Sequence, residues 1–225
     1  MNHLSPGERR ELAIHLGDDA ARLEAGVSSD SLLDARSQYD APARRDDELD
    51  HGDPRIEGWA SALSRWGQEA CARGALACAR LILPIWTAEF PRDQRLHLAL
   101  ETAARAAAAR QWGPLPPRIT AQIDACAAAV RAAHQDDVVR ACRAASIAVD
   151  GLRDAASHAG LAAVFAFRVV GWASSEQSRR HAPGLAALWR ALGQDPAYAP
   201  LLTLPRSNRP RAVVRMAVRR ELLGR

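Results

Sequence analysis

Apolar residues recur every three or four positions along most of the chain, which is the spacing of one face of an α-helix. Clear examples lie near the N-terminus, after residue 56 and after Pro91: Leu12, Leu16 and Leu23; Trp59, Leu63 and Trp66; Leu96, Leu100 and Ala104. No segment alternates apolar and polar residues as a strand does. Alanine is abundant and aromatic residues make up only 5% of the chain, which also favours helices. We therefore predict an all-α fold, a multi-helix bundle of about eight helices.

Local signals predict where several helices begin and end. The run Ser5-Pro6-Gly7-Glu8 combines a capping Ser, a Pro at the first helical position and a Glu three residues after the cap. A helix beginning at Ile56 is expected to continue to Leu83, where Pro84 predicts a kink or a break. The later helices are expected over Arg118–Ala133, Asp136–His158, Leu161–Ser175, Gly184–Leu192 and Arg209–Leu223.

The periodicity fails in one internal stretch, which divides the chain. We predict an N-terminal two-helix appendage over 1–40, an acidic linker or loop over 41–55, and a helical bundle with a basic C-terminal helix over 56–225. Ala-rich stretches within the bundle would let neighbouring helix axes approach closely.

Four cysteines without paired spacing predict free thiols in a reducing compartment, and hence a cytoplasmic protein. The N-terminus has no apolar run typical of a secretory signal. The most apolar stretch, Leu161–Ala173, is too short to span a bilayer and contains Arg168, so no membrane association is expected.

Titratable residues give little indication of catalysis. Two groups have a spacing of four residues, which puts them on one helix face: Asp93, His97 and Glu101, and then Asp150, Asp154 and His158. Di-iron helical bundles instead use a Glu-x-x-His motif on the helices of the bundle, which neither of these two groups contains. Phosphate loops, nucleophile elbows and zinc-protease motifs are missing. We therefore expect no enzyme activity, no metal and no cofactor, with a metal-dependent enzyme as a rival hypothesis.

The net charge is only +4, but charge is unevenly distributed along the chain. Five carboxylates in the acidic stretch could enter a basic cleft of a partner as phosphate mimics: Asp46, Asp47, Glu48, Asp50 and Asp53. The last helix places Arg211, Arg215 and Arg219 in a stripe, and Glu221 is the single carboxylate among many arginines there. Such a stripe could bind nucleic acid or an acidic partner. The alternative is that both regions are solvated or pair with each other.

One segment carries a more specific pattern. It contains Cys78-Ala79, then Leu83-Pro84 before Trp86, then Phe90-Pro91-Arg92-Asp93-Gln94-Arg95, and an Ala-rich helix follows it. This segment resembles a family of immunity proteins from bacterial polymorphic toxin systems, over about Trp66 to Trp172. The family usually has Pro after the Arg, where this chain has Leu96.

The resemblance implies an all-helical cytoplasmic protein that binds and neutralises a cognate protein toxin without catalysis. Four residues of the pattern, Pro84, Pro91, Asp93 and Arg95, are expected to build a corner between two helices. Asp93 would bond the exposed amides of the next helix, and Arg95 would pair with a nearby carboxylate. The toxin-binding surface is then expected elsewhere. The main alternative is a nucleic-acid-binding or regulatory protein that uses the C-terminal arginines.

Overall fold

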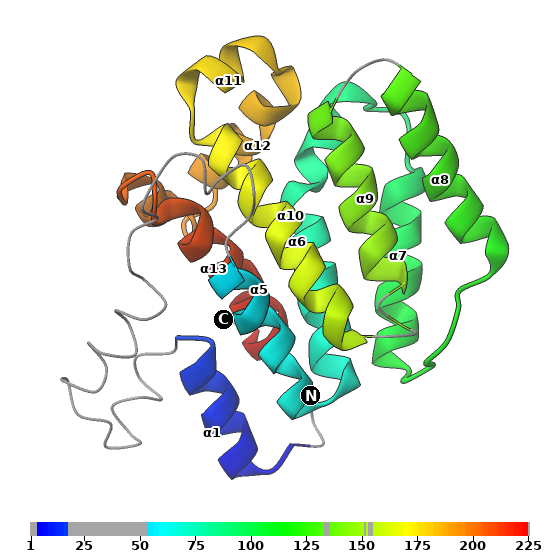
Figure 1. The fold of residues 1–225 in the computed structure, drawn as a ribbon, viewed down its shortest axis with the longest axis vertical. Coiled ribbons are helices and arrows are strands. Elements are labelled where there is room, and N and C mark those ends of the chain that lie inside the picture. Colours follow the sequence, from blue (N-terminus) through cyan, green and yellow to red (C-terminus); the bar gives the residue numbers. More distant parts are fainter. Residues whose placement is uncertain (1–3, 18–53, 133–135, 151, 153–154, 225) are drawn as a thin grey trace.

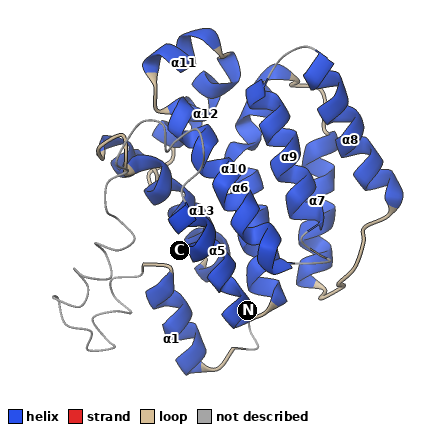
Figure 2. Cartoon of the chain, in the orientation of Figure 1, coloured by secondary structure: helices blue, strands red, loops and turns tan. Residues whose placement is uncertain are grey.

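The computed structural model describes residues 4–17, 54–132, 136–150, 152 and 155–224. These residues form ten α-helices and two short 3-10 helices, with no strand among them (Figure 2). The predicted all-α fold is confirmed, with somewhat more helices than the sequence indicated.

Figure 1 shows the order of the helices along the chain. They are α1 (Pro6–His15), α5 (Pro54–Ser61), η1 (Ala62–Trp66), α6 (Gln68–Glu89), α7 (Arg95–Ala108), α8 (Pro117–Ala132), α9 (Asp136–Asp150), α10 (Ala155–Ala173), α11 (Glu176–His181), α12 (Pro183–Gln194), η2 (Ala199–Thr203) and α13 (Arg209–Leu223).

Helix α6 is the centre of the bundle. It contacts α7, α9, α10, α12 and α13, and most of its side chains are buried. Many of these side chains are small, including Ala72, Ala75 and Ala79, so the surrounding helices can pack close to its axis. A Cβ added at Gly74 would lie only 2.7 Å from a methyl group of Leu63, which shows how tight this packing is.

Two helices end earlier than the apolar pattern predicted. The helix expected to run without interruption from Ile56 to Leu83 ends at Gly67, whose φ of 90° lies outside the helical region. The helix expected over Asp136–His158 ends at Asp150, and His158 belongs to α10 instead. Gly151 follows Asp150 in the sequence, and glycine commonly follows a helix end. In both places the apolar spacing continues past the break, which is why the periodicity missed it.

Pro84 does not break its helix, because α6 continues to Glu89. Proline has no amide hydrogen, so it cannot donate to the carbonyl of Arg80 one turn earlier. The hydroxyl of Thr87 donates to the carbonyl of Leu83 at 3.3 Å in the same turn. The sequence allowed either a kink or a break near Leu83, and the break does not occur.

The first helix shares the core of the bundle. The Ser5 side chain accepts from the amide of Glu8 at 3.2 Å, and the Glu8 carboxylate accepts from the amide of Ser5, so the predicted capping box is confirmed. Leu12 and Leu16 are buried in the same cluster as the α6 side chains. The buried side of α1 is thus part of the same hydrophobic core as α6. The second helix predicted before residue 40, and the linker up to residue 53, lie outside the described residues.

Helix α6 is also long and apolar enough to cross a bilayer, judged by length and composition alone. However, 72% of its most apolar window is buried inside the bundle, as is typical of the core helix of a helical protein.

Candidate functional site

The corner between α6 and α7 is held by Asp93 and Arg95. The Asp93 carboxylate accepts hydrogen bonds from the backbone amide of Arg95 and from its guanidinium Nε, both at 3.0 Å. These bonds, led by the one from the Arg95 side chain, hold the pKa of Asp93 below its ordinary value. The indole of Trp86 donates to the Asp93 carbonyl at 2.9 Å, which ties the corner to α6. Pro91 is exposed in the turn. These contacts fix the angle between the two helices.

The C-terminal arginine stripe is not the exposed face that the sequence predicted. Arg211 is only 2% exposed. The guanidinium of Arg215 lies over the Trp59 ring at 5.4 Å, and Arg219 donates to the carbonyl of Gly17 at 3.2 Å. The stripe is only partly exposed because this side of α13 contacts the N-terminal part of the chain, at Trp59 and Gly17. The five carboxylates at positions 46 to 53 lie outside the described residues.

The two expected His and carboxylate faces do not assemble. His97 bonds to the hydroxyl of Thr87 at 2.9 Å, while Asp93 is engaged with Arg95 before α7 begins. Asp150 and His158 lie on different helices, and Asp154 is outside the described residues. Within the described part of the chain, no group of three or more His, Cys, Asp or Glu side chains could hold a metal ion.

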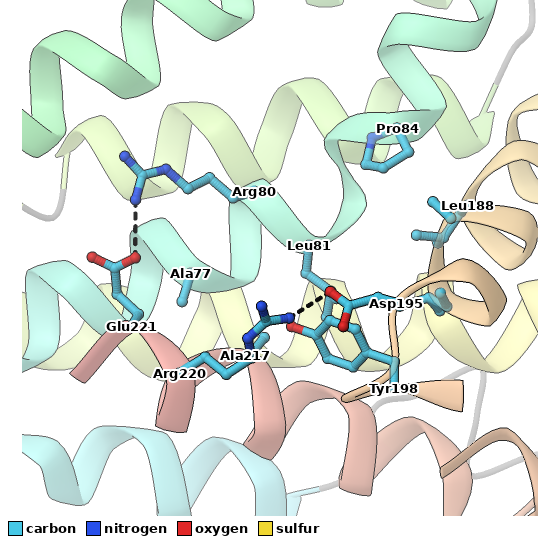
Figure 3. A pocket seen from close by; sticks show the side chains of 12 residues that line it. Ala77, Arg80, Leu81, Pro84, Leu188, Asp195, Tyr198, Ala217, Arg220 and Glu221 are labelled. Carbon is cyan, nitrogen blue, oxygen red and sulfur yellow. Dashed lines mark hydrogen bonds and ion pairs between the residues drawn. The ribbon is translucent and has the colours of Figure 1, made fainter. Parts of the chain in front are cut away.

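The structure instead reveals a groove along α6, which the sequence did not indicate. Three adjoining recesses share Arg80 and have volumes of about 380, 490 and 570 Å³. We call these three recesses together the α6 groove. Its floor is the outer face of α6, and its walls come from α7, α12 and α13. Figure 3 shows the middle recess, where side chains from α6, α12 and α13 converge.

The carboxylates of the α6 groove are all held by arginines. Glu221 accepts from Arg80 at 3.0 Å and from Arg73 at 3.3 Å (Figure 3 draws the first bond). Glu69 lies 3.6 Å from the guanidinium groups of Arg73 and Arg110. These pairs link α6 to α13 and to the end of α7.

A second ion pair closes the other end of the middle recess. Arg220 pairs with Asp195, and its guanidinium lies 5.5 Å from the centre of the Tyr198 ring (Figure 3). Asp195 also accepts from the amide of Ala197 at 2.9 Å. This end of the groove is therefore preorganised by a short polar network.

The recess between α6 and α12 has a different character. Its lining is mainly small or apolar, with Leu83, Pro84, Ala88, Ala187 and Ala191. Arg80 and Arg190 add positive charge to this lining, and Arg190 is exposed. Ala187, Ala191 and Gln194 recur at helical spacing on α12, which is the one sequence signal that could have indicated this surface.

The α6 groove offers groups for recognition, and no activated nucleophile lines it. Cys71 and Cys78 lie on α6 but are buried, and burial raises the pKa of their thiols to about 11 and about 12. Both thiols are protonated at neutral pH and are poor nucleophiles. Fixed arginines beside small apolar side chains suit the binding of a partner surface with apolar and acidic side chains.

Comparison with protein-family models, curated proteins and solved structures finds no match to this chain. The helical fold and the α6 groove therefore carry the functional argument together with the motif of residues 78–101.

Proposed function

We propose that the chain is a cytoplasmic immunity protein that binds a cognate protein toxin and neutralises it without catalysis. The observation that carries the proposal is the α6 groove, which is partly lined by the segment that resembles the immunity proteins. Arg80, Pro84, Thr87 and His97 of that segment line the recess between α6 and α12, and of these only Pro84 belongs to the resembling pattern. The proposed surface therefore lies beside the corner, whereas the resemblance alone predicted a surface elsewhere. The segment that carries the resemblance thus builds a surface with the features of a binding site.

The charges in the α6 groove support binding over chemistry. A general acid or base needs a free ionisable group whose pKa lies near the working pH. Here Glu69, Asp195 and Glu221 already hold arginines, and His97 is bonded to the hydroxyl of Thr87. Ionised pairs of this kind orient a partner and discriminate between partners. The four cysteines are free and buried, which suits the reducing cytoplasm.

The first test is genetic. A toxin gene is expected beside the gene for this chain, and expression of that toxin alone should arrest growth. Co-expression with the chain should restore growth, and the two purified proteins should form a stable complex. Arrested growth in the presence of the chain, with no complex formed, would contradict the proposal.

The second test locates the surface with one pair of bulky substitutions. Ala187→Trp fills the recess between α6 and α12, whereas Ala121→Trp adds the same side chain at an exposed position on α8. If the α6 groove binds the toxin, A187W should abolish rescue and A121W should not, while both melt like the parent. Rescue by A187W would exclude the groove as the binding surface.

The acidic stretch is the competing surface within the same function. Replacing Asp46, Asp47, Glu48, Asp50 and Asp53 with amides should slow toxin association about ten-fold at low salt if they steer the encounter. Unchanged association would remove these residues from the interface and leave the groove.

A further inference from the structure

Two arginines, Arg179 and Arg209, lie against the ring of Trp189 on α12, and a third, Arg206, lies near Arg209. The guanidinium of Arg179, from α11, lies 4.5 Å from the centre of the Trp189 ring. The guanidinium of Arg209, at the start of α13, lies 5.2 Å from the same centre. Arg206 is exposed in the preceding turn, close enough for its charge to act on Arg209. We call Arg179, Trp189, Arg206 and Arg209 the Arg–Trp cluster.

Like charges are held together in this cluster. Arg179 donates to the carbonyl of Ala173 at 2.6 Å, and Arg209 donates to the carbonyl of Leu204 at 2.8 Å. These bonds fix the two side chains but leave their charge uncompensated. The pKa of Arg209 is lowered, mainly because this side chain is partly buried, and in addition because the charges of Arg179 and Arg206 lie nearby.

No carboxylate among the described residues pairs with the arginines of the cluster. The nearest in sequence, Glu176 on α11, pairs with Arg180. Asp195, which follows α12, pairs with Arg220. Elsewhere in the described part of the chain, arginines such as Arg73, Arg80 and Arg95 hold carboxylates. The arginines of the cluster differ from these three, and they resemble Arg105 and Arg190, which bond to a hydroxyl and a carbonyl.

Trp189 gives the cluster the composition of an interface hot spot. Its ring packs partly against the hydrophobic core, so it is held in place before any partner arrives. Trp and Arg are the residues that most often dominate binding at protein interfaces. A guanidinium also presents a planar fork that matches a carboxylate.

We propose that the Arg–Trp cluster binds carboxylate side chains of an acidic segment on the partner protein. This inference rests on the proposed function for the identity of the partner, the toxin, and adds a second contact surface to the α6 groove. A protein carboxylate fits better than nucleic acid, because two of the arginines lie against one ring and the cluster does not form an extended track. In the stripe that could have extended such a track, Arg211 is buried, and Arg215 and Arg219 are half-buried and engaged with Trp59 and Gly17.

A labelled hexaglutamate peptide is the probe, and its binding is measured by fluorescence anisotropy at about 50 mM salt, where screening is weak. The parent should bind hexaglutamate and not hexaglutamine. Arg179→Gln with Arg209→Gln removes two charges while leaving amide donors for the two carbonyls. The matched control is Arg118→Gln with Arg143→Gln, at exposed positions on α8 and α9.

The cluster variant should weaken hexaglutamate binding at least ten-fold, on the order expected for loss of local charge pairing, and the control less than two-fold. Arg206→Gln, at an exposed position, should weaken binding about three-fold without disturbing packing. Equal weakening by the cluster variant and the control would overturn the proposal. So would tighter binding of a single-stranded oligonucleotide that is lost in the cluster variant, since the cluster would then serve nucleic acid.

The toxin separates this inference from the function on which it rests. If the toxin complex forms but R179Q/R209Q leaves its affinity unchanged, the inference fails and the immunity function stands. If hexaglutamate binding depends on the cluster while no toxin complex forms, the cluster stands as a carboxylate site and the immunity function fails.

Discussion

His15 should make the docking of α1 dependent on pH. Its Nε2 donates to the carbonyl of Trp59 at 2.9 Å, and the Trp59 indole donates back to the carbonyl of His15 at 3.1 Å. The imidazole stacks on Trp59, with ring centres 5.5 Å apart, and lies 4.9 Å from Trp66. Burial lowers the pKa of His15 from 6.5 to about 4. The bond to Trp59 opposes this shift in part, and the charges of Arg215 and Arg65 add to it.

The direction of the effect follows from this lowered pKa. Between pH 4 and pH 6.5 the unfolded chain binds a proton at His15 that the folded chain does not bind. The free energy of unfolding therefore rises with pH through this window. The contribution of His15 to this free energy is lost as pH falls toward 4. Integrated from pH 7.5 to pH 4.5, the two pKa values give a loss of about 2.5 kcal/mol from this one residue.

Denaturant unfolding at pH 7.5 and pH 4.5 measures the loss, and a variant isolates it from other titrating groups. His15→Gln keeps an amide that can donate to the Trp59 carbonyl but does not titrate. Its loss of stability between the two pH values should be smaller than that of the parent by about 2.5 kcal/mol. His181→Gln, at an exposed position at the end of α11, should respond like the parent. Equal losses in the parent and H15Q would refute the reasoning.

Two further predictions concern stability. Gly160→Ala should cost about 1–3 kcal/mol in chemical denaturation, because the new methyl would meet Ser61 and lie 3.2 Å from the Glu57 carbonyl where α10 crosses α5. Gly193→Ala, whose new methyl would make ordinary van der Waals contact with Leu202 at 3.9 Å, should instead stabilise by about 0.5–1 kcal/mol, and a loss there would contradict this account. Asp93→Ala should lower stability by about 1 kcal/mol by removing the acceptor for the Arg95 amide, with toxin binding unchanged. A variant that melts like the parent but no longer binds would make this corner part of the interface.

Features that depend on neighbours in sequence could be predicted from the sequence. The Ser5 and Glu8 bonds require only residues three positions apart, and the bonds of Asp93 to Arg95 require only two. The breaks at Gly67 and after Asp150 were missed because apolar spacing continues on both sides of them. Hydrophobic periodicity shows which face of a helix is buried. Two consecutive helices can bury faces that continue the same spacing, so the periodicity does not show the break between them.

The α6 groove could not be predicted, because its walls come from helices far apart in the sequence. Arg80 and Glu221 are separated by 141 residues, yet they are joined by a 3.0 Å ion pair. Nothing local to either residue indicates this partner. The same reason explains the error at Arg211, since an amphipathic pattern does not reveal whether another element covers its polar side.

The ion pairs of the structure show what the charged residues of the C-terminal helix bind. Glu221, the single carboxylate among its arginines, holds Arg73 and Arg80 of α6 and so fastens α13 to the central helix. Arg220 in turn holds Asp195 after α12. Most charges of α13 thus serve to attach it to the bundle. Among the described residues, Arg206 and Arg209, the latter beside Trp189, hold no carboxylate. In the proposal above, the acidic partner binds where this positive charge is left after internal pairing, and the net charge of the helix alone would not have indicated that place.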